Sequence, residues 1–312
     1  MKRLKMSALQ SEIVAVRQLL EEGQGLDPLG DLSLRNRLEG LQRELEELQG
    51  QDQKHASVAL MFYGEPVQGS RGIDAEFAGK AIQNYQLALS KHMVSLAGGN
   101  LGARGPIPER KLSRLNVTDV VHGSFGFFLE EDSEDTGEMF ETALHNSVKE
   151  ISKIMDGIAG VSDQDFEAAI DQVDSRTFAS IKALFELMHR EGAAFKIVDD
   201  EEERAFDAAR IERAYERVEQ VDLSEDQIEL GGILIGVIPI GRRFEFREID
   251  TDVVLKGVVS PKLSADFLER IQHDEQVIGK RWSASFLRRR VVRPDGRERT
   301  EFTLLELNQR LD

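Results

Sequence analysis

The chain has no cysteine among its 312 residues, which excludes a disulfide framework and thiolate metal sites. Histidine and carboxylate side chains are the conventional metal ligands that remain, and the six histidines stand singly along the sequence. We predict neither a metal site nor a cofactor. A chain without cysteine fits a reducing compartment, so we expect a cytoplasmic protein.

Long apolar runs are missing as well. No stretch reaches the roughly 18 apolar residues that a membrane-spanning helix needs. The first residues soon form an amphipathic pattern instead of an unbroken apolar signal region. We therefore expect no membrane span, no export signal and no membrane partner.

Strings typical of catalytic sites are absent too. The sequence has no HExxH, GxGxxG or GxSxG string. A phosphate loop needs four residues between its glycines, whereas six separate Gly72 from Gly79. A calcium-like start at Asp132 has Ala143 at the position of the bidentate carboxylate. These mismatches favour a protein that is not an enzyme.

Two weaker catalytic signals remain. Glu109 stands two residues before Lys111, a spacing that metal-dependent nucleases use to bind a cation and polarise a water molecule. His122 and Ser124 lie beside glycines and have the side chains of a base and a nucleophile. One hypothesis is therefore a metal-dependent hydrolase or nuclease whose residues converge only in the fold.

Charge is distributed unevenly. The net charge is -17, yet residues 130–229 alone hold 29 acidic and 10 basic groups, while the segments on either side are nearly balanced. An acidic chain binds nucleic acid poorly without a local basic patch, because attraction to phosphate supplies most non-specific affinity. Nucleic-acid binding would therefore have to use a cluster of cations.

The first 50 residues contain two helical patterns with apolar residues at spacings of three and four. Each covers only about two heptads, which is too short for a stable isolated helix. The helices must pack against each other, against the same segment of a second chain, or on the middle of the chain. The residues expected to mediate oligomerisation are Leu9, Ile13, Val16, Leu20, Leu34, Leu38, Leu41, Leu45 and Leu48.

The rest of the chain divides into two predicted domains. Residues 56–222 mix strand and helix patterns in an acidic α+β domain, with one helix expected over 203–219. Residues 226–308 predict three strands, a helix and two strands, and the last hairpin turns at Arg293-Pro294-Asp295-Gly296. This order resembles an OB-fold or an SH3-like barrel. The predicted class is α+β: a helical hairpin or short coiled coil over residues 1–50, a mixed middle domain and a five-stranded small β-barrel.

Cations gather at the final hairpin, where only Asp295 and Glu298 are acidic. Guanidinium groups beside Trp282 and Phe286 can grip phosphates while a ring stacks on a base. Alternatively, the arginines meet the acidic middle of the same or a neighbouring chain, and Trp282, Ala284 and Phe286 share an inward face. The cations are Lys280, Arg281, Arg288, Arg289, Arg290, Arg293, Arg297 and Arg299.

These features lead to a principal hypothesis and two alternatives. We expect a non-catalytic oligomeric adaptor or assembly protein that associates with itself and docks another protein through the barrel or the acidic middle domain. The first alternative is a nucleic-acid-binding subunit that uses the basic C-terminal hairpin. The second is the hydrolase or nuclease described above.

Overall fold

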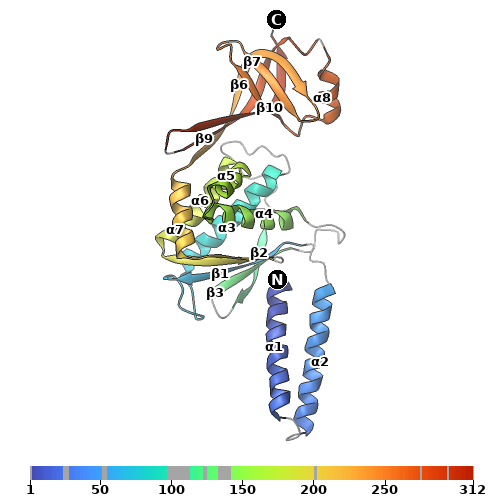
Figure 1. Cartoon of the computed structure of the whole chain (residues 1–312), viewed down its shortest axis with the longest axis vertical. Helices are drawn as coiled ribbons and strands as arrows, with labels where there is room; N and C mark the ends of the chain where they lie inside the picture. The colour runs from blue at the N-terminus through green and yellow to red at the C-terminus, as the bar shows by residue number, and fades with distance from the viewer. Residues whose placement is uncertain are drawn as a thin grey trace.

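The computed structural model describes residues 2–23, 28–50, 55–96, 113–121, 125–132, 142–199, 202–274, 276–293 and 295–311. Within these ranges the chain is a mixed α+β protein with eight helices and two five-stranded sheets. Figure 1 shows a pair of N-terminal helices at one end, a sheet covered by helices in the middle, and a C-terminal sheet at the other end. None of the helices in the described part combines the length and hydropathy that crossing a membrane requires.

The two N-terminal helices, α1 (Lys2–Gly23) and α2 (Pro28–Gly50), pack against each other. Leu9, Ile13 and Val16 are buried, as their spacing predicts for a shared seam. An ion pair between Glu12 and Arg37 links the helices. The apolar seams therefore meet within one chain, and a coiled coil with a second chain stays a prediction.

The middle part, which we call the body, is built on an antiparallel sheet in the order β2-β3-β1-β4-β5. Alternate side chains of the central strand, such as Val58, Leu60 and Phe62, belong to the main hydrophobic core. The strands are β1 (Ser57–Gly64), β2 (Leu115–Val121), β3 (Phe125–Glu131), β4 (Ala193–Val198) and β5 (Glu203–Phe206).

Helices cover the core side of this sheet (Figure 1). A new helix begins after Asp174, whose carboxylate accepts hydrogen bonds from the N–H groups of Arg176 and Thr177 and caps it. The helices of the body are α3 (Ala75–Leu96), α4 (Ala143–Ala159), α5 (Asp163–Asp171), α6 (Ser175–Arg190) and α7 (Ala208–Glu219).

The single helix expected over residues 203–219 is wrong. Residues 203–206 form β5, in which Arg204 and Phe206 are buried and Glu203 and Ala205 are exposed. Phe206 stacks on Phe195 of β4 with ring centroids 4.5 Å apart. Helix α7 starts afterwards, because the Asp207 carboxylate accepts a hydrogen bond from Arg210 N–H. The alternation of exposed and buried positions covers only residues 203–206. It was too short to predict a strand beside the helical pattern that follows it.

The C-terminal strands pair in a ring, which we call the closed sheet. Its order is β10-β8-β7-β6-β9, and β9 pairs with β10 to complete the ring. Phe244, Phe246 and Phe286 fill its interior, and Leu268 of α8 (Ala265–Ile271) packs on them. Likeness to an OB-fold or SH3-like barrel stays a prediction. The strands are β6 (Asp222–Ile238), β7 (Arg243–Glu248), β8 (Val254–Val259), β9 (Arg281–Val292) and β10 (Glu298–Arg310).

Candidate functional site

Three strands of the closed sheet extend beyond the ring toward the body (Figure 1). In this three-stranded ribbon, Glu225 of β6 lies opposite Arg289 of β9, which lies opposite Glu301 of β10. Side chains directly opposite each other on neighbouring strands point to the same face. The register therefore places one cation between two carboxylates.

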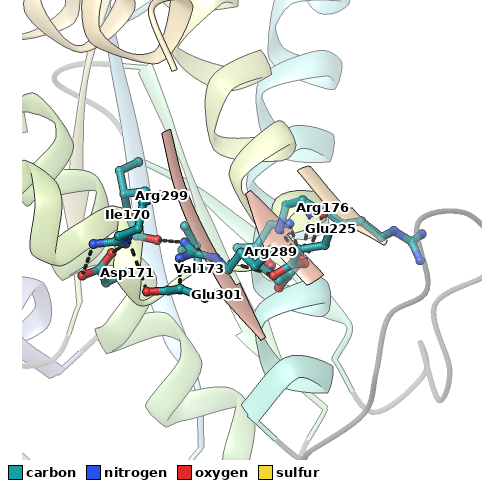
Figure 2. A network of polar contacts seen from close by, with 11 residues as sticks. Ile170, Asp171, Val173, Arg176, Glu225, Arg289, Arg299 and Glu301 are labelled. Carbon is teal, nitrogen blue, oxygen red and sulfur yellow. Dashed lines mark hydrogen bonds and ion pairs between the residues drawn. The ribbon is translucent and has the colours of Figure 1, made fainter. Parts of the chain in front are cut away.

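Arg289 is the centre of the contact between ribbon and body (Figure 2). Its guanidinium lies 3.6 Å from the Glu225 carboxylate and donates a hydrogen bond of 2.9 Å to Glu301. It also donates to the carbonyl oxygens of Ile170 and Val173, at 2.7 and 3.3 Å. Because α5 ends here, its last carbonyls favour a nearby cation.

Two further arginines reach α5. Arg299 pairs with Asp171, and its Nε lies 3.4 Å from Glu301. Arg293 pairs with Glu167 and lies over the ring of Phe166, 5.6 Å from its centroid. We call the set Glu167, Asp171, Glu225, Arg289, Arg293, Arg299 and Glu301 the joint, since it connects the closed sheet to the body.

The remaining cations of the hairpin differ in their surroundings. Arg288 binds Asp226 through two hydrogen bonds of 3.0 and 2.6 Å, and Arg297 pairs with Asp295 in its own turn. Arg290 has a buried Nε without a hydrogen-bond partner among the described residues. At the far end of β9, Arg281 is exposed and Lys280 is half-buried.

The aromatic residues of β9 face the interior of the closed sheet. Phe286 and Ala284 are fully buried, and Trp282 packs on the same core. The indole N–H of Trp282 donates a hydrogen bond of 3.0 Å to the Val277 carbonyl. Stacking of Trp282 on a base would require its removal from this position. Binding of phosphate by the joint arginines would likewise require them to exchange their carboxylate partners.

Burial raises the pKa of the Glu225 carboxyl above its ordinary value, and repulsion from Asp174 adds to the effect. Two hydrogen bonds from Ser175, of 3.0 and 3.2 Å, and the charge of Arg289 act in the opposite direction. The folded protein therefore binds a proton at Glu225 more readily than the unfolded chain does. Such a group stabilises the fold below its unfolded pKa and loses this contribution as pH rises through the raised value.

We expect this to appear in a pH series of Glu225→Gln, whose amide does not titrate. The free energy of unfolding of wild type minus that of the variant should decrease between about pH 4.5 and neutral pH. Urea titrations at several pH values measure it, and Glu298→Gln serves as a control on the exposed end of the same ribbon. A difference that is constant or grows with pH would contradict the raised pKa.

An open cleft of about 910 Å³ lies beside the joint, between the body and the turn of β9 and β10. The residues that line the cleft carry no net charge, because they include four arginines and four carboxylates. Arg217 of α7, for example, donates 2.8 Å and 2.7 Å hydrogen bonds to the Gly160 carbonyl and to Asp163. The charged residues are Asp163, Glu167, Arg217, Arg293, Asp295, Arg297, Glu298 and Arg299.

The described part of the chain does not include the predicted catalytic candidates. Glu109, Lys111, His122 and Ser124 all lie outside the described residues. In the ranges that the structure covers, no group of three or more histidine and carboxylate side chains is arranged to hold a metal ion. The described features that can indicate a function are therefore the joint, the closed sheet and the helix pair.

The helix pair places its seam residues unequally. Leu9, Ile13 and Val16 of α1 are buried, and Leu20 is half-buried. The side chain of Leu48 lies outside the described residues. The opposing seam leucines of α2 are half-buried: Leu34, Leu38, Leu41 and Leu45.

Sequence reasoning did not identify the carboxylates that the hairpin arginines bind. Glu167 and Asp171 lie on α5, and Glu225 lies on β6 one residue before the C-terminal domain predicted over residues 226–308. No apolar alternation marks this part of β6, because residues 224–227 are all polar. The pairing with β9 could not be read from it, because register depends on the closed sheet as a whole.

Comparison of the chain with protein-family models, with curated proteins and with solved structures gives no match. The functional proposal therefore depends on the sequence and on the geometry of the chain itself.

Proposed function

We propose that this chain is a non-catalytic oligomeric adaptor or assembly protein. The helix pair joins copies of the chain, and the closed sheet or the acidic body docks another protein. The observation that carries the proposal is the incomplete burial of the helix pair.

The helix pair is short of packing partners. Its helices pack mainly against each other, and they project from the body (Figure 1). Val14, Leu19 and Leu32 are more than half exposed. A pair of short helices with so thin a core is marginal alone. A second pair would cover the exposed aliphatic side chains and the half-buried leucines of α2 in a four-helix bundle.

The closed sheet lies at the other end of the molecule and is attached to the body. This attachment supports a role as an adaptor. The joint attaches the closed sheet to the body through ion pairs of Arg293 with Glu167 and of Arg299 with Asp171. Arg289 adds hydrogen bonds to the carbonyl oxygens of Ile170 and Val173. Because Glu225 and Arg289 are largely buried, these contacts are less screened by solvent than surface pairs. A partner docked on the closed sheet would thus be held in a fixed position relative to the body.

Light scattering coupled to gel filtration tests the self-association. We expect wild type at micromolar concentration to have at least twice the 35.1 kDa mass of one chain. Leu19→Glu combined with Leu32→Glu should give the mass of one chain, because burying two carboxylates in a bundle core is unfavourable. Circular dichroism should show that the helices of the body are retained, with any loss of helix content limited to the helix pair.

Val161→Glu is the matched control, since Val161 is an aliphatic residue of the body with 78% exposure and is not part of the helix pair. It should keep the mass of wild type. Wild type with the mass of one chain throughout would remove the oligomeric part of the proposal.

A further inference from the structure

The turn between β6 and β7 presents an apolar surface that the core of the closed sheet does not use. Ile240 is 100% exposed, Ile238 58% and Val258 50%. Single exposed aliphatic side chains are common on proteins and need no explanation. Contiguous exposed apolar residues, by contrast, are a feature of interaction surfaces.

These side chains are brought together by strand register. Ile238 lies opposite Arg243, which lies opposite Val258, so the three form one row across β6, β7 and β8. Neighbouring strands are about 4.8 Å apart, and opposed residues share a face. Ile240 follows in the turn itself. The row therefore places a cation between two exposed aliphatic side chains.

Arg243 is available to a partner. Its guanidinium is exposed and has no hydrogen bond or ion pair with any other described residue. Its aliphatic stem lies close to the backbone of Gly241, since a β-carbon built there would be 3.7 Å from Arg243 Cγ. No acidic residue occurs between Ile238 and Phe244. Glu245, two residues further along the same face of β7, is paired with Lys256, so Arg243 has no carboxylate partner at this surface among the described residues.

The turn is held in a fixed conformation by the preceding residue. Arg242 has a φ of 44°, a left-handed conformation that residues other than glycine rarely adopt. Its guanidinium donates to the carbonyl oxygens of Val259, Ser260 and Leu263, and its own carbonyl accepts a 2.7 Å hydrogen bond from Val259 N–H. Strained backbone persists where its surroundings determine it, and it is frequent at ligand-binding sites.

We propose that this surface, the β6–β7 tip (Ile238, Ile240, Arg243 and Val258), docks an acidic peptide segment of another protein. A carboxylate of the segment pairs with Arg243, and aliphatic or aromatic side chains on either side of it contact Ile238, Ile240 and Val258. Arginine suits this role because its planar fork matches a carboxylate. The proposal deepens the proposed function, since it names the docking surface of the closed sheet and the chemistry of its partner.

The geometry favours recognition by side chains. At the tip, Arg243 of β7 lies opposite Ile238 of β6 on one side and Val258 of β8 on the other, so the central strand of the row has no free edge for an added strand. A small preorganised patch of this kind suits a transient contact, because little is lost in ordering the protein.

A peptide fits better than an anionic membrane surface. A membrane would meet the field of the whole chain, whose net charge is -17, whereas a short peptide brings only a few charges to the tip. The tip has no exposed aromatic side chain, which is the usual feature of membrane interfaces.

Selection from a library of short random peptides displayed on phage tests the proposal without assuming a sequence. The full chain is the bait, and Ile240→Asp removes peptides that bind elsewhere. Enriched peptides should contain Asp or Glu flanked by aliphatic or aromatic residues. Fluorescence anisotropy with a synthetic copy should then show about tenfold weaker binding to Ile240→Asp and to Arg243→Glu. Val161→Asp, at a 78% exposed aliphatic side chain of the body, should bind as wild type does.

Failure of this inference is distinguishable from failure of the proposed function. Each variant changes an exposed residue and should keep the oligomeric mass and the urea midpoint of wild type. Enrichment of neutral or basic peptides, no enrichment, or equal binding by all variants would overturn the docking site whatever the mass. Binding of phosphatidylserine vesicles that Ile240→Asp abolishes, without peptide binding, would overturn it in favour of a lipid surface.

Discussion

Replacing Arg289 with alanine is expected to lower the free energy of unfolding by about 3–5 kcal/mol at neutral pH. The guanidinium lies between Glu225 and Glu301 and holds the carbonyls at the end of α5. Its side chain is only 12% exposed and that of Glu225 only 10%. The variant therefore leaves a buried carboxylate without its cation, beside carbonyl oxygens without their donor.

Urea denaturation of four proteins isolates this effect: wild type, Arg289→Ala, Glu225→Gln and the double variant. The loss caused by Arg289→Ala should be smaller in the Glu225→Gln background, because no buried charge is left unpaired there. The loss should also shrink at mildly acidic pH, where Glu225 takes up a proton.

Arg297→Ala is the matched control in the same hairpin. Its side chain is 84% exposed and pairs with Asp295 within its own turn. Exposed ion pairs contribute little, so the expected change is within about 0.5 kcal/mol. Equal losses for the two arginine variants would show that the joint contributes no more than an ordinary surface pair.

The helix pair was the most predictable part of the fold. The spacing of Leu9, Ile13 and Val16 is a local property of the chain, and the structure buries these side chains together against α2. The seam could not show whether its partner lies in the same chain, since a leucine seam fits either arrangement. In the structure, the seam of α1 packs against α2 of the same chain. Light scattering tests whether helix pairs of different chains also associate.

The arginine hairpin shows where sequence reasoning stopped. The position of the cation cluster follows from counting charged residues in the sequence. So does the interpretation that its arginines contact the acidic middle of the chain. Which carboxylates meet Arg289 depends on the register of β6 with β9 and on the docking of α5, both long-range contacts. The β6–β7 tip was missed for the same reason. Ile238 and Val258 are twenty residues apart, and only strand pairing makes them neighbours of Arg243.

Adding one methyl group at Gly257 is expected to cost about 3 kcal/mol or more, at the upper end of overpacking effects. A β-carbon there would lie 1.9 Å from the Phe302 carbonyl oxygen and 2.9 Å from the ring of Phe244. Gly257 lies opposite Phe302 in the short parallel pairing of β8 with β10 that closes the ring. Gly257→Ala must therefore push these strands apart.

Gly236→Ala is the matched control, since a β-carbon at Gly236 has no atom within 4 Å. Its effect should stay within about 1 kcal/mol. Trp282 is the single tryptophan of the chain and packs on the core of the closed sheet, so its fluorescence follows this part in urea. Far-ultraviolet circular dichroism follows chiefly the helices of the body and the helix pair.

In Gly257→Ala the fluorescence transition should move to lower urea than the dichroism transition, because the added atom acts inside the ring while the body retains its own core. If both transitions move together, the joint couples the two parts into one cooperative unit. An unchanged fluorescence transition would instead mean that the pairing of β8 with β10 contributes little stability. The two variants at Gly257 and Arg289 thus separate closure of the ring from its attachment to the body.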